Sequence, residues 1–221
     1  PPMEKQEILR YLGAGNSDPQ LDLLIARAEK ELIQAAMPRY VSGKFSLSVR
    51  DDGAVIGGTY LPSKTLAAHL KGCQEAFLVA FTLGPGVDAL IRRYELVEMS
   101  LVPVLQACAA VYTEEQADQA QEDLETYAKE KGLFLRPRYS PGYGDLPLSS
   151  QRFLFDALQV SKKIGVTLTD TFLMLPMKSI TGVVGLSKDP SLCHVDKCMS
   201  CSAKNCPFRK GEENDTRTKE E

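Results

Sequence analysis

The sequence predicts an α+β domain followed by a small C-terminal metal-binding knuckle. The domain is predicted because some segments carry apolar residues at helical spacing, while other short segments alternate or run continuously apolar like strands. The knuckle is predicted because four of the six cysteines lie between Cys193 and Cys206. A disulfide-stabilised secreted scaffold would spread its cysteines through the fold. This clustering therefore indicates a metal site in a reducing cytoplasm.

The composition narrows the classes of function. Hydrophobic residues make up 43% and charged residues 25% of the 221 residues, which is typical of a globular domain. The formal net charge of -3 lacks the basic excess of most nucleic-acid-binding proteins. No apolar run reaches the ~18–20 residues of a membrane span, and the first residues have no signal-peptide pattern. We therefore expect a cytoplasmic protein that binds neither nucleic acid nor a membrane.

The first third alternates between helices and strands. Residues 21–36 carry a helical apolar stripe that ends at Met37-Pro38. Residues 45–49 alternate with period two, and 54–61 can return as the hairpin partner after Asp51-Asp52-Gly53. Ser63 is a suitable N-cap for a short helix over 64–71, with Gly72 at its C-terminal end. The apolar run 76–83 is short enough to be a buried strand.

The remaining elements follow from similar signals. We expect a helix over 87–96, and a long helix over 100–131 that is apolar at its start, acidic later, and stopped by Gly132. A strand at 133–135 should lead into the Pro/Gly-rich loop 136–147. Ser149 or Ser150 can cap a helix over 151–164 that Gly165 ends. Strands are expected at 166–175 and 179–186, on either side of Pro176.

One motif indicates a family. The stretch Arg138-Tyr139-Ser140-Pro141-Gly142-Tyr143 reads Arg-x-x-Pro-Gly-Tyr, and a spaced pattern follows it. That pattern comprises Pro147, Gln151, Ile164-Gly165-Val166-Thr167-Leu168-Thr169-Asp170 and Met174-x-Pro176-x-x-Ser179-x-x-Gly182. This order and spacing resemble the activation (reactivation) domain of vitamin B12-dependent methionine synthase.

The resemblance implies a fold and a role. The fold is α+β, with a curved, mostly antiparallel sheet flanked by helices. Domains of this family bind S-adenosylmethionine and dock over the corrin ring of cobalamin. When the cofactor is oxidised to cob(II)alamin, an external electron and a methyl group from S-adenosylmethionine restore methylcobalamin.

The resemblance also implies four ligand-binding residues: Arg138, Pro141, Gly142 and Tyr143. The guanidinium of Arg138 is suited to the carboxylate of the ligand, and Pro141 stiffens the loop. Gly142 allows close backbone approach and unusual dihedral angles, while Tyr143 offers an aromatic face and a hydroxyl. The alternative is a rigid turn in which Arg138 pairs with an acidic neighbour.

Several other polar residues have a structural and a functional interpretation. Glu114 and Asp118 share a helix face, so they could hold the sulfonium or amino group of the ligand, or could form a solvated surface. Thr167, Thr169, Asp170 and Ser179 lie beside apolar runs, and strand edges and turn caps explain them best. A lone His69 on the short helix is more often structural than catalytic.

The chain also departs from the family pattern. The substrate and cobalamin domains of the synthase would not fit into this chain, which resembles stand-alone members that act on a separate corrinoid protein. An aromatic-containing segment that contributes to the family's cofactor site is replaced here by Cys193 and its neighbours. We divide the chain into an N-terminal helical region packed on the domain (1–39), the activation-like domain (40–187), the cysteine-rich knuckle (188–209) and a disordered charged tail (210–221).

The cysteine cluster has the spacing Cys193-x4-Cys198-x2-Cys201-x4-Cys206-Pro207. Four thiolates suffice for a tetrahedral zinc site or an iron–sulfur cluster, and a proline after the last cysteine occurs in ferredoxin-type ligation. The inferred reaction needs an electron, which favours iron–sulfur, but the spacing leaves both metals open. Cys73 and Cys108 lie on apolar segments and are expected in the core.

Two functions remain for this sequence. The first is a reactivation factor that binds S-adenosylmethionine and supports reductive methylation of cob(II)alamin on a corrinoid protein, with an electron donor protein as a further partner. The alternative is a non-catalytic module that binds a corrinoid protein and carries a structural zinc. A Rossmann methyltransferase is disfavoured, because no complete glycine-rich loop follows an early strand.

Overall fold

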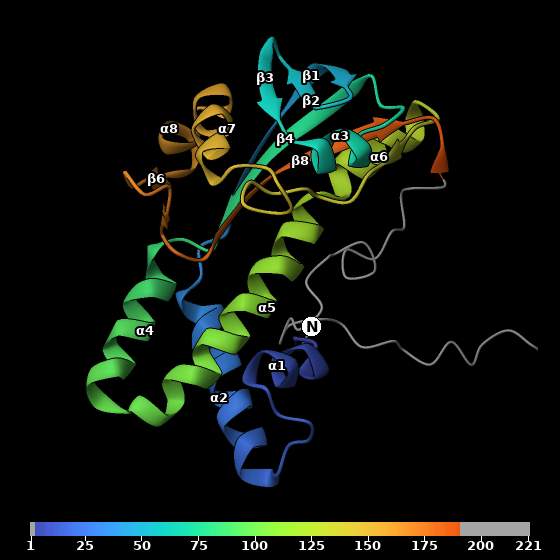
Figure 1. Ribbon diagram of the computed structural model, residues 1–221. Coiled ribbons are helices and arrows are strands. Elements are labelled where there is room, and N and C mark those ends of the chain that lie inside the picture. Colours follow the sequence, from blue (N-terminus) through green and yellow to red (C-terminus); the bar gives the residue numbers. More distant parts are fainter. Residues whose placement is uncertain (1–2, 191–221) are drawn as a thin grey trace, which may run out of the picture.

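The structure is a computed structural model that describes residues 3–190. Its centre is a six-stranded sheet with the order β3-β2-β1-β4-β8-β5, in which every strand pair is antiparallel. The strands are β1 Arg39–Arg50, β2 Gly53–Ile56, β3 Thr59–Pro62, β4 Glu75–Thr82, β5 Phe134–Leu135 and β8 Ser179–Ser187. The expected α+β fold with an antiparallel sheet and flanking helices is confirmed (Figure 1).

Helices flank the sheet and extend beyond one end of it (Figure 1). The helices are α1 Lys5–Leu12, α2 Pro19–Ala35, α3 Lys64–His69, α4 Pro85–Val97, α5 Val102–Ala120, α6 Glu122–Glu130, α7 Gln151–Leu158 and α8 Val160–Ile164. Short 3-10 turns cover Met99–Leu101 and Leu148–Ser150. No helix among residues 3–190 has both the length and the apolar character needed to cross a membrane.

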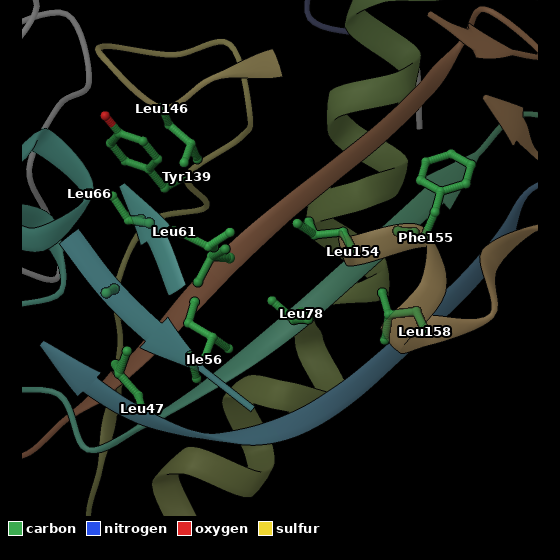
Figure 2. Packing of buried hydrophobic residues seen from close by; sticks show 14 of the residues in the cluster. Leu47, Ile56, Leu61, Leu66, Leu78, Tyr139, Leu146, Leu154, Phe155 and Leu158 are labelled. Carbon is green, nitrogen blue, oxygen red and sulfur yellow. The ribbon is translucent and has the colours of Figure 1, made fainter. Parts of the chain in front are cut away.

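Alternation along the strands gives the sheet two different faces. Ala76, Leu78 and Ala80 of β4 face a core completed by α3, α7 and α8, part of which Figure 2 shows. Phe77 and Val79 point to the opposite face, where α6 covers them. A third core joins α1, α2, α4 and α5 below the sheet. We name the first side the α3 face and the second side the α5 face, because α5 leads into α6 there.

Local signals in the sequence explain several boundaries. The Ser63 hydroxyl accepts a hydrogen bond from the Leu66 backbone N–H at 3.0 Å, which confirms the predicted N-cap of α3. The strand predicted over 76–83 corresponds to β4. Gly165 ends α8 in the left-handed conformation with φ 73°, as predicted for a C-terminal glycine.

Three predicted elements were too long. Residues 54–61 form two strands, because Gly57-Gly58 makes a turn between them. The helix predicted over 100–131 is interrupted at Gln121, which separates α5 from α6. The helix predicted over 151–164 is interrupted at Gln159, whose φ of 54° is incompatible with a continuous helix.

Two further predictions were wrong. Ser150 precedes α7 but makes no capping hydrogen bond with its side chain. Residues 166–175 do not form one strand; only β6 Thr167–Leu168 and β7 Met174–Leu175 pair there. The Thr169 hydroxyl accepts a hydrogen bond from the Leu173 backbone N–H at 3.0 Å, and this local bond favours a turn over a continuous strand.

Candidate functional site

The Arg-x-x-Pro-Gly-Tyr loop begins at a β-bulge against β8. Leu135 lies opposite Leu186, whereas Tyr139 lies opposite Val183. Four steps along the loop strand therefore match three steps along β8, so one residue is inserted. Pro137 lies inside this interval, and its missing N–H costs no ladder hydrogen bond at a bulge. The inserted residue reverses the direction of the side chains that follow it.

The bulge directs Arg138 to the α5 face. Its side chain is 4% exposed, and its guanidinium contacts two carboxylates and one amide of the helical layer. Nη1 donates to Gln121 Oε1 at 2.9 Å, and Nη2 lies 2.6 Å from Glu114 Oε2 and 3.0 Å from Asp118 Oδ1. Glu114 and Asp118 remain 52% and 69% exposed at their side chains. One cation and two anions give this group a net charge of -1, and its acids face solvent.

Gly182, the last residue of the family pattern, lies directly beneath the Arg138 side chain, and this explains why a glycine is needed there. A Cβ placed on Gly182 of β8 would lie 2.5 Å from Arg138 Cγ, which is too close for any side chain. Glycine at this position lets the arginine stem cross directly over the β8 backbone. The pattern Ser179-x-x-Gly182 and the loop motif are therefore parts of one packing arrangement.

The other three predicted ligand residues lie further along the loop. Gly142 has φ 88°, the left-handed conformation that was expected of it, and Pro141 is buried. The Tyr143 ring packs edge-on against the Tyr139 ring, with centroids 5.3 Å apart, beside the core of the α3 face. Arg138 reaches α5 instead, so the structure places the two side chains on different faces of the sheet.

A second contact fixes the far end of this loop. The Asp145 carboxylate accepts hydrogen bonds from the hydroxyls of Ser63 and Thr65 and from the backbone N–H groups of Lys64 and Thr65. These donors, led by the Ser63 hydroxyl, hold the pKa of Asp145 well below its usual range. Tyr139 joins the same network, with its hydroxyl 2.6 Å from Thr65 Oγ1. We call this group the Asp145 contact.

The Asp145 contact was missed by the sequence analysis. Asp145 and Thr65 are 80 residues apart, and no local pattern links a helix start to a distant loop. Ser63 was predicted only as a helix cap, and its hydroxyl also donates to Asp145.

Burial raises the pKa of the Tyr139 phenol, so the Tyr139 hydroxyl stays protonated and keeps its hydrogen bonds at neutral pH.

A family model matches the part of the chain that contains this loop. Residues 105–211 match the family model described as "Vitamin B12 dependent methionine synthase, activation domain". The resemblance to the activation-domain family is confirmed. The matched range contains the whole Arg138–Gly182 pattern, the acidic end of α5 and the four clustered cysteines.

The fold agrees with the activation-domain family. A crystal structure described as the MetH reactivation domain bound to AdoHcy superposes with a TM-score of 0.65 and 17% sequence identity. The alignment covers 88% of this chain and 75% of that chain. At this identity the likeness establishes the shared fold. A comparison with curated proteins finds no match.

The remaining polar residues of the activation-domain pattern have structural contacts. Ser179 is buried, and its hydroxyl donates to the Pro176 carbonyl at 2.7 Å. Thr169 closes the turn between β6 and β7. His69 Nε2 lies 2.8 Å from the Pro137 carbonyl oxygen, so this histidine supports the bulge. These contacts agree with the structural interpretation of Ser179, Thr169 and His69.

The predicted metal ligands Cys193, Cys198, Cys201 and Cys206 lie outside the described residues, as does the predicted tail 210–221. Within residues 3–190, no group of three or more His, Cys, Asp or Glu side chains is arranged to hold a metal ion. Cys73 and Cys108 are buried, as predicted for core residues. Burial raises the pKa of the Cys108 thiol to about 12, so it remains a neutral thiol at physiological pH.

Proposed function

We propose that this chain binds S-adenosylmethionine and supports reductive methylation of cob(II)alamin on a separate corrinoid protein. The match to the activation-domain family supports the general role. The observation that carries the proposal is the charge arrangement around Arg138, a buried guanidinium next to two solvent-facing carboxylates.

This arrangement complements the charges of the proposed ligand. S-adenosylmethionine has one carboxylate, one ammonium and one sulfonium, and therefore a net charge of +1, opposite to that of the Arg138 group. The ligand carboxylate can replace Glu114 or Asp118 on the guanidinium, where planar, bidentate pairing is favourable. The displaced acid then pairs with the ligand ammonium or sulfonium. Both acids are exposed enough to exchange partners in this way.

The chemistry requires an electron and a methyl donor. One electron reduces cob(II)alamin on the partner to cob(I)alamin, whose cobalt lone pair attacks the methyl carbon. The methyl–sulfonium bond breaks, giving methylcobalamin and S-adenosylhomocysteine. This chain would contribute by binding and orienting the methyl donor, since no acid or base is needed for the transfer itself.

We further propose that Cys193, Cys198, Cys201 and Cys206 bind a metal. An iron–sulfur cluster could pass the electron from a donor protein, whereas zinc would only hold the C-terminal segment together. Four thiolates remain available in a reducing cytoplasm, where such sites are common. Metal analysis of an anaerobic preparation separates the two metals, because iron with acid-labile sulfide and zinc are measured independently.

Calorimetry with S-adenosylmethionine tests the ligand proposal. Wild type should bind, and Arg138→Ala should bind at least about 10-fold more weakly, because a charge-assisted hydrogen-bond pair is lost. Arg50→Ala, which removes an exposed arginine on β1, is the matched control and should bind like wild type. No binding by wild type would contradict the assignment, and equal binding by Arg138→Ala would remove this residue from the site.

One observation favours the alternative function. Arg138 already has three partners within the fold, so its charge is paired without a ligand. A corrinoid-binding module with a structural zinc would need no methyl donor. A protein that binds a cob(II)alamin-loaded corrinoid protein, but forms no methylcobalamin when reductant and S-adenosylmethionine are added, would be this module.

A further inference from the structure

A cavity of about 630 Å³ opens between α7, α8 and β6, which lie close together at one edge of the sheet (Figure 1). Its most buried lining residues are Phe155 and Leu168, and exposed polar side chains surround them. The helices α7 and α8 cover the α3 face, whereas Arg138 points to the α5 face. This volume, with an apolar floor and a polar rim, is typical of a site for a small molecule. We call it the α7–α8 cavity.

The charges of the α7–α8 cavity are opposite in sign to that of the whole chain. Arg152 and Lys162 supply two cations and Asp156 one anion, so the cavity has a net charge of +1 in a chain of net charge -3. None of the three forms an ion pair among residues 3–190. This part of the surface therefore favours an anionic ligand.

The position of Arg152 leaves its charge available. Arg152 and Asp156 are four residues apart on α7, the spacing at which helical ion pairs form. The Arg152 guanidinium instead lies over the Phe172 ring, 5.7 Å from its centroid. A contact with an aromatic face orients the guanidinium without neutralising it, so Arg152 can still pair with an anion.

Two unusual backbone conformations flank the α7–α8 cavity. Gln159, with φ 54°, lines it, and Phe172, with φ 63°, contacts Arg152. They are the two non-glycine residues with positive φ among residues 3–190. Such conformations are uncommon for side chains other than glycine, and they cluster at ligand-binding sites. The interruption at Gln159 also separates α8, which carries Lys162, from α7, which carries Arg152.

We propose that the α7–α8 cavity binds a phosphate monoester with a flat apolar ring, of the kind that a nucleoside monophosphate provides. The phosphate pairs with Arg152 and Lys162. The ring contacts Phe155 and Leu168, and the sugar hydroxyls donate to the Asp156 carboxylate. This inference goes beyond the proposed function, because the Arg138 group has a net charge of -1 and suits a cation, whereas this cavity suits an anion.

Calorimetry with adenosine 5′-monophosphate (AMP) as the probe tests the proposal. Wild type should bind AMP at least about 10-fold more tightly than adenosine or inorganic phosphate, because each of these lacks one half of the contacts. No binding of AMP would overturn the proposal. Equal binding of inorganic phosphate would also overturn it, since the cavity would then hold a simple anion.

Two neighbouring lysines provide a matched pair of variants. Lys162 lines the cavity, whereas Lys163 is equally classed as exposed and does not line it. Lys162→Met should weaken AMP binding by about 5-fold or more, because a charge-assisted contact to phosphate is lost. Lys163→Met should bind AMP like wild type. An equal loss in both variants would reduce the effect to general surface charge and contradict the site.

Asp156 tests the position of the sugar. Wild type should prefer AMP by about 5-fold over 2′,3′-dideoxyadenosine 5′-monophosphate, which lacks the sugar hydroxyls. Asp156→Ala should remove this preference, because no carboxylate remains to accept from the hydroxyls. A preference that survives in Asp156→Ala would overturn the proposed orientation of the ligand.

Wild-type protein separates this site from the proposed S-adenosylmethionine site. Addition of AMP should shift the backbone amide resonances of Gln159, Ser161 and Thr167, and saturating AMP should leave S-adenosylmethionine binding unchanged. Displacement of AMP by S-adenosylmethionine would place the anion at the Arg138 group and overturn the inference. Binding of AMP without binding of S-adenosylmethionine would contradict the proposed function and support the α7–α8 site.

Discussion

Arg136 and Arg138 are two residues apart and both buried, but they contact different groups. Arg138 points to the α5 face and contacts Glu114, Asp118 and Gln121. Arg136 points to the α3 face, where its Nη2 contacts the Lys71 carbonyl and the Ser187 hydroxyl. The contrast teaches that burial alone does not define the role of an arginine. Arg138 is paired with acids of α5, whereas Nε and Nη1 of Arg136 have no hydrogen-bond partner among residues 3–190.

The bulge at Pro137 is the cause of the difference. Two residues apart in a regular strand would lie on the same face. The inserted residue between Leu135 and Tyr139 turns the second arginine to the other face. This one bulge therefore places Arg136 on the α3 face and Arg138 on the α5 face of the sheet.

The largest expected change in stability comes from substitutions in the cores on the two faces of the sheet. Leu78 of β4 is fully buried on the α3 face, and Leu78→Ala should reduce the free energy of unfolding by about 2–5 kcal/mol. Val79→Ala, next to it on the α5 face, removes two carbon atoms instead of three and should reduce the free energy of unfolding by less. Urea unfolding measures both. A larger loss from Val79→Ala would mean that the smaller α6 core dominates stability.

The next effect probes the two arginines through neighbouring glycines. Gly182→Ala should destabilise by about 1–3 kcal/mol and displace Arg138, because the new Cβ lies 2.5 Å from Arg138 Cγ. Gly185→Ala meets Leu70 and Cys73 on the α3 face, so it should affect the Arg136 side instead. Gly15→Ala, with no atom within 4 Å, is the control for unfolding measurements. If Gly182→Ala weakens S-adenosylmethionine binding and Gly185→Ala does not, the ligand site lies on the α5 face with Arg138.

A smaller effect concerns the Asp145 contact and depends on pH. Folding lowers the pKa of Asp145. The Asp145 carboxylate therefore stabilises the folded protein at pH values above its unfolded pKa of about 3.9, and this stabilisation is lost as pH falls through its lower pKa in the folded protein. Asp145→Asn should therefore lower the thermal midpoint at pH 7, and the gap to wild type should narrow below about pH 4. A gap that is constant down to pH 2 would contradict this account.

The smallest effect is expected at the acids around Arg138. Glu114→Gln and Asp118→Asn should each change stability by less than about 1 kcal/mol, because both side chains are more than half exposed and one acid remains. Arg136 has no comparable acidic partner among residues 3–190. A loss of several kcal/mol from either variant would show that the Arg138 group is structural, and would favour the non-catalytic module.

Local chemistry explains which parts of the fold were predictable. Ser63 begins a helix and Gly165 ends one through contacts within a few residues, so both were visible in the sequence. The interruptions at Gln121 and Gln159 carry no proline or glycine, so the sequence offers no local signal for them. The motif identified Arg138. The sequence left two interpretations of it open, a contact to the ligand carboxylate or a pairing with an acidic neighbour. Arg136 was not recognised, because a bulge cannot be read without the register of β8.

The loop from Tyr139 to Asp145 has a final consequence for binding. Two backbone hydrogen bonds to Val183 hold its first residue, and the Asp145 contact holds its last. The conformational entropy of this loop is therefore lost when the protein folds, before any ligand arrives. A molecule that binds there meets a pre-organised surface, so little of its interaction free energy is spent on ordering the protein. Binding at the proposed site would therefore gain from the stiffness of this loop as well as from the groups that the loop presents.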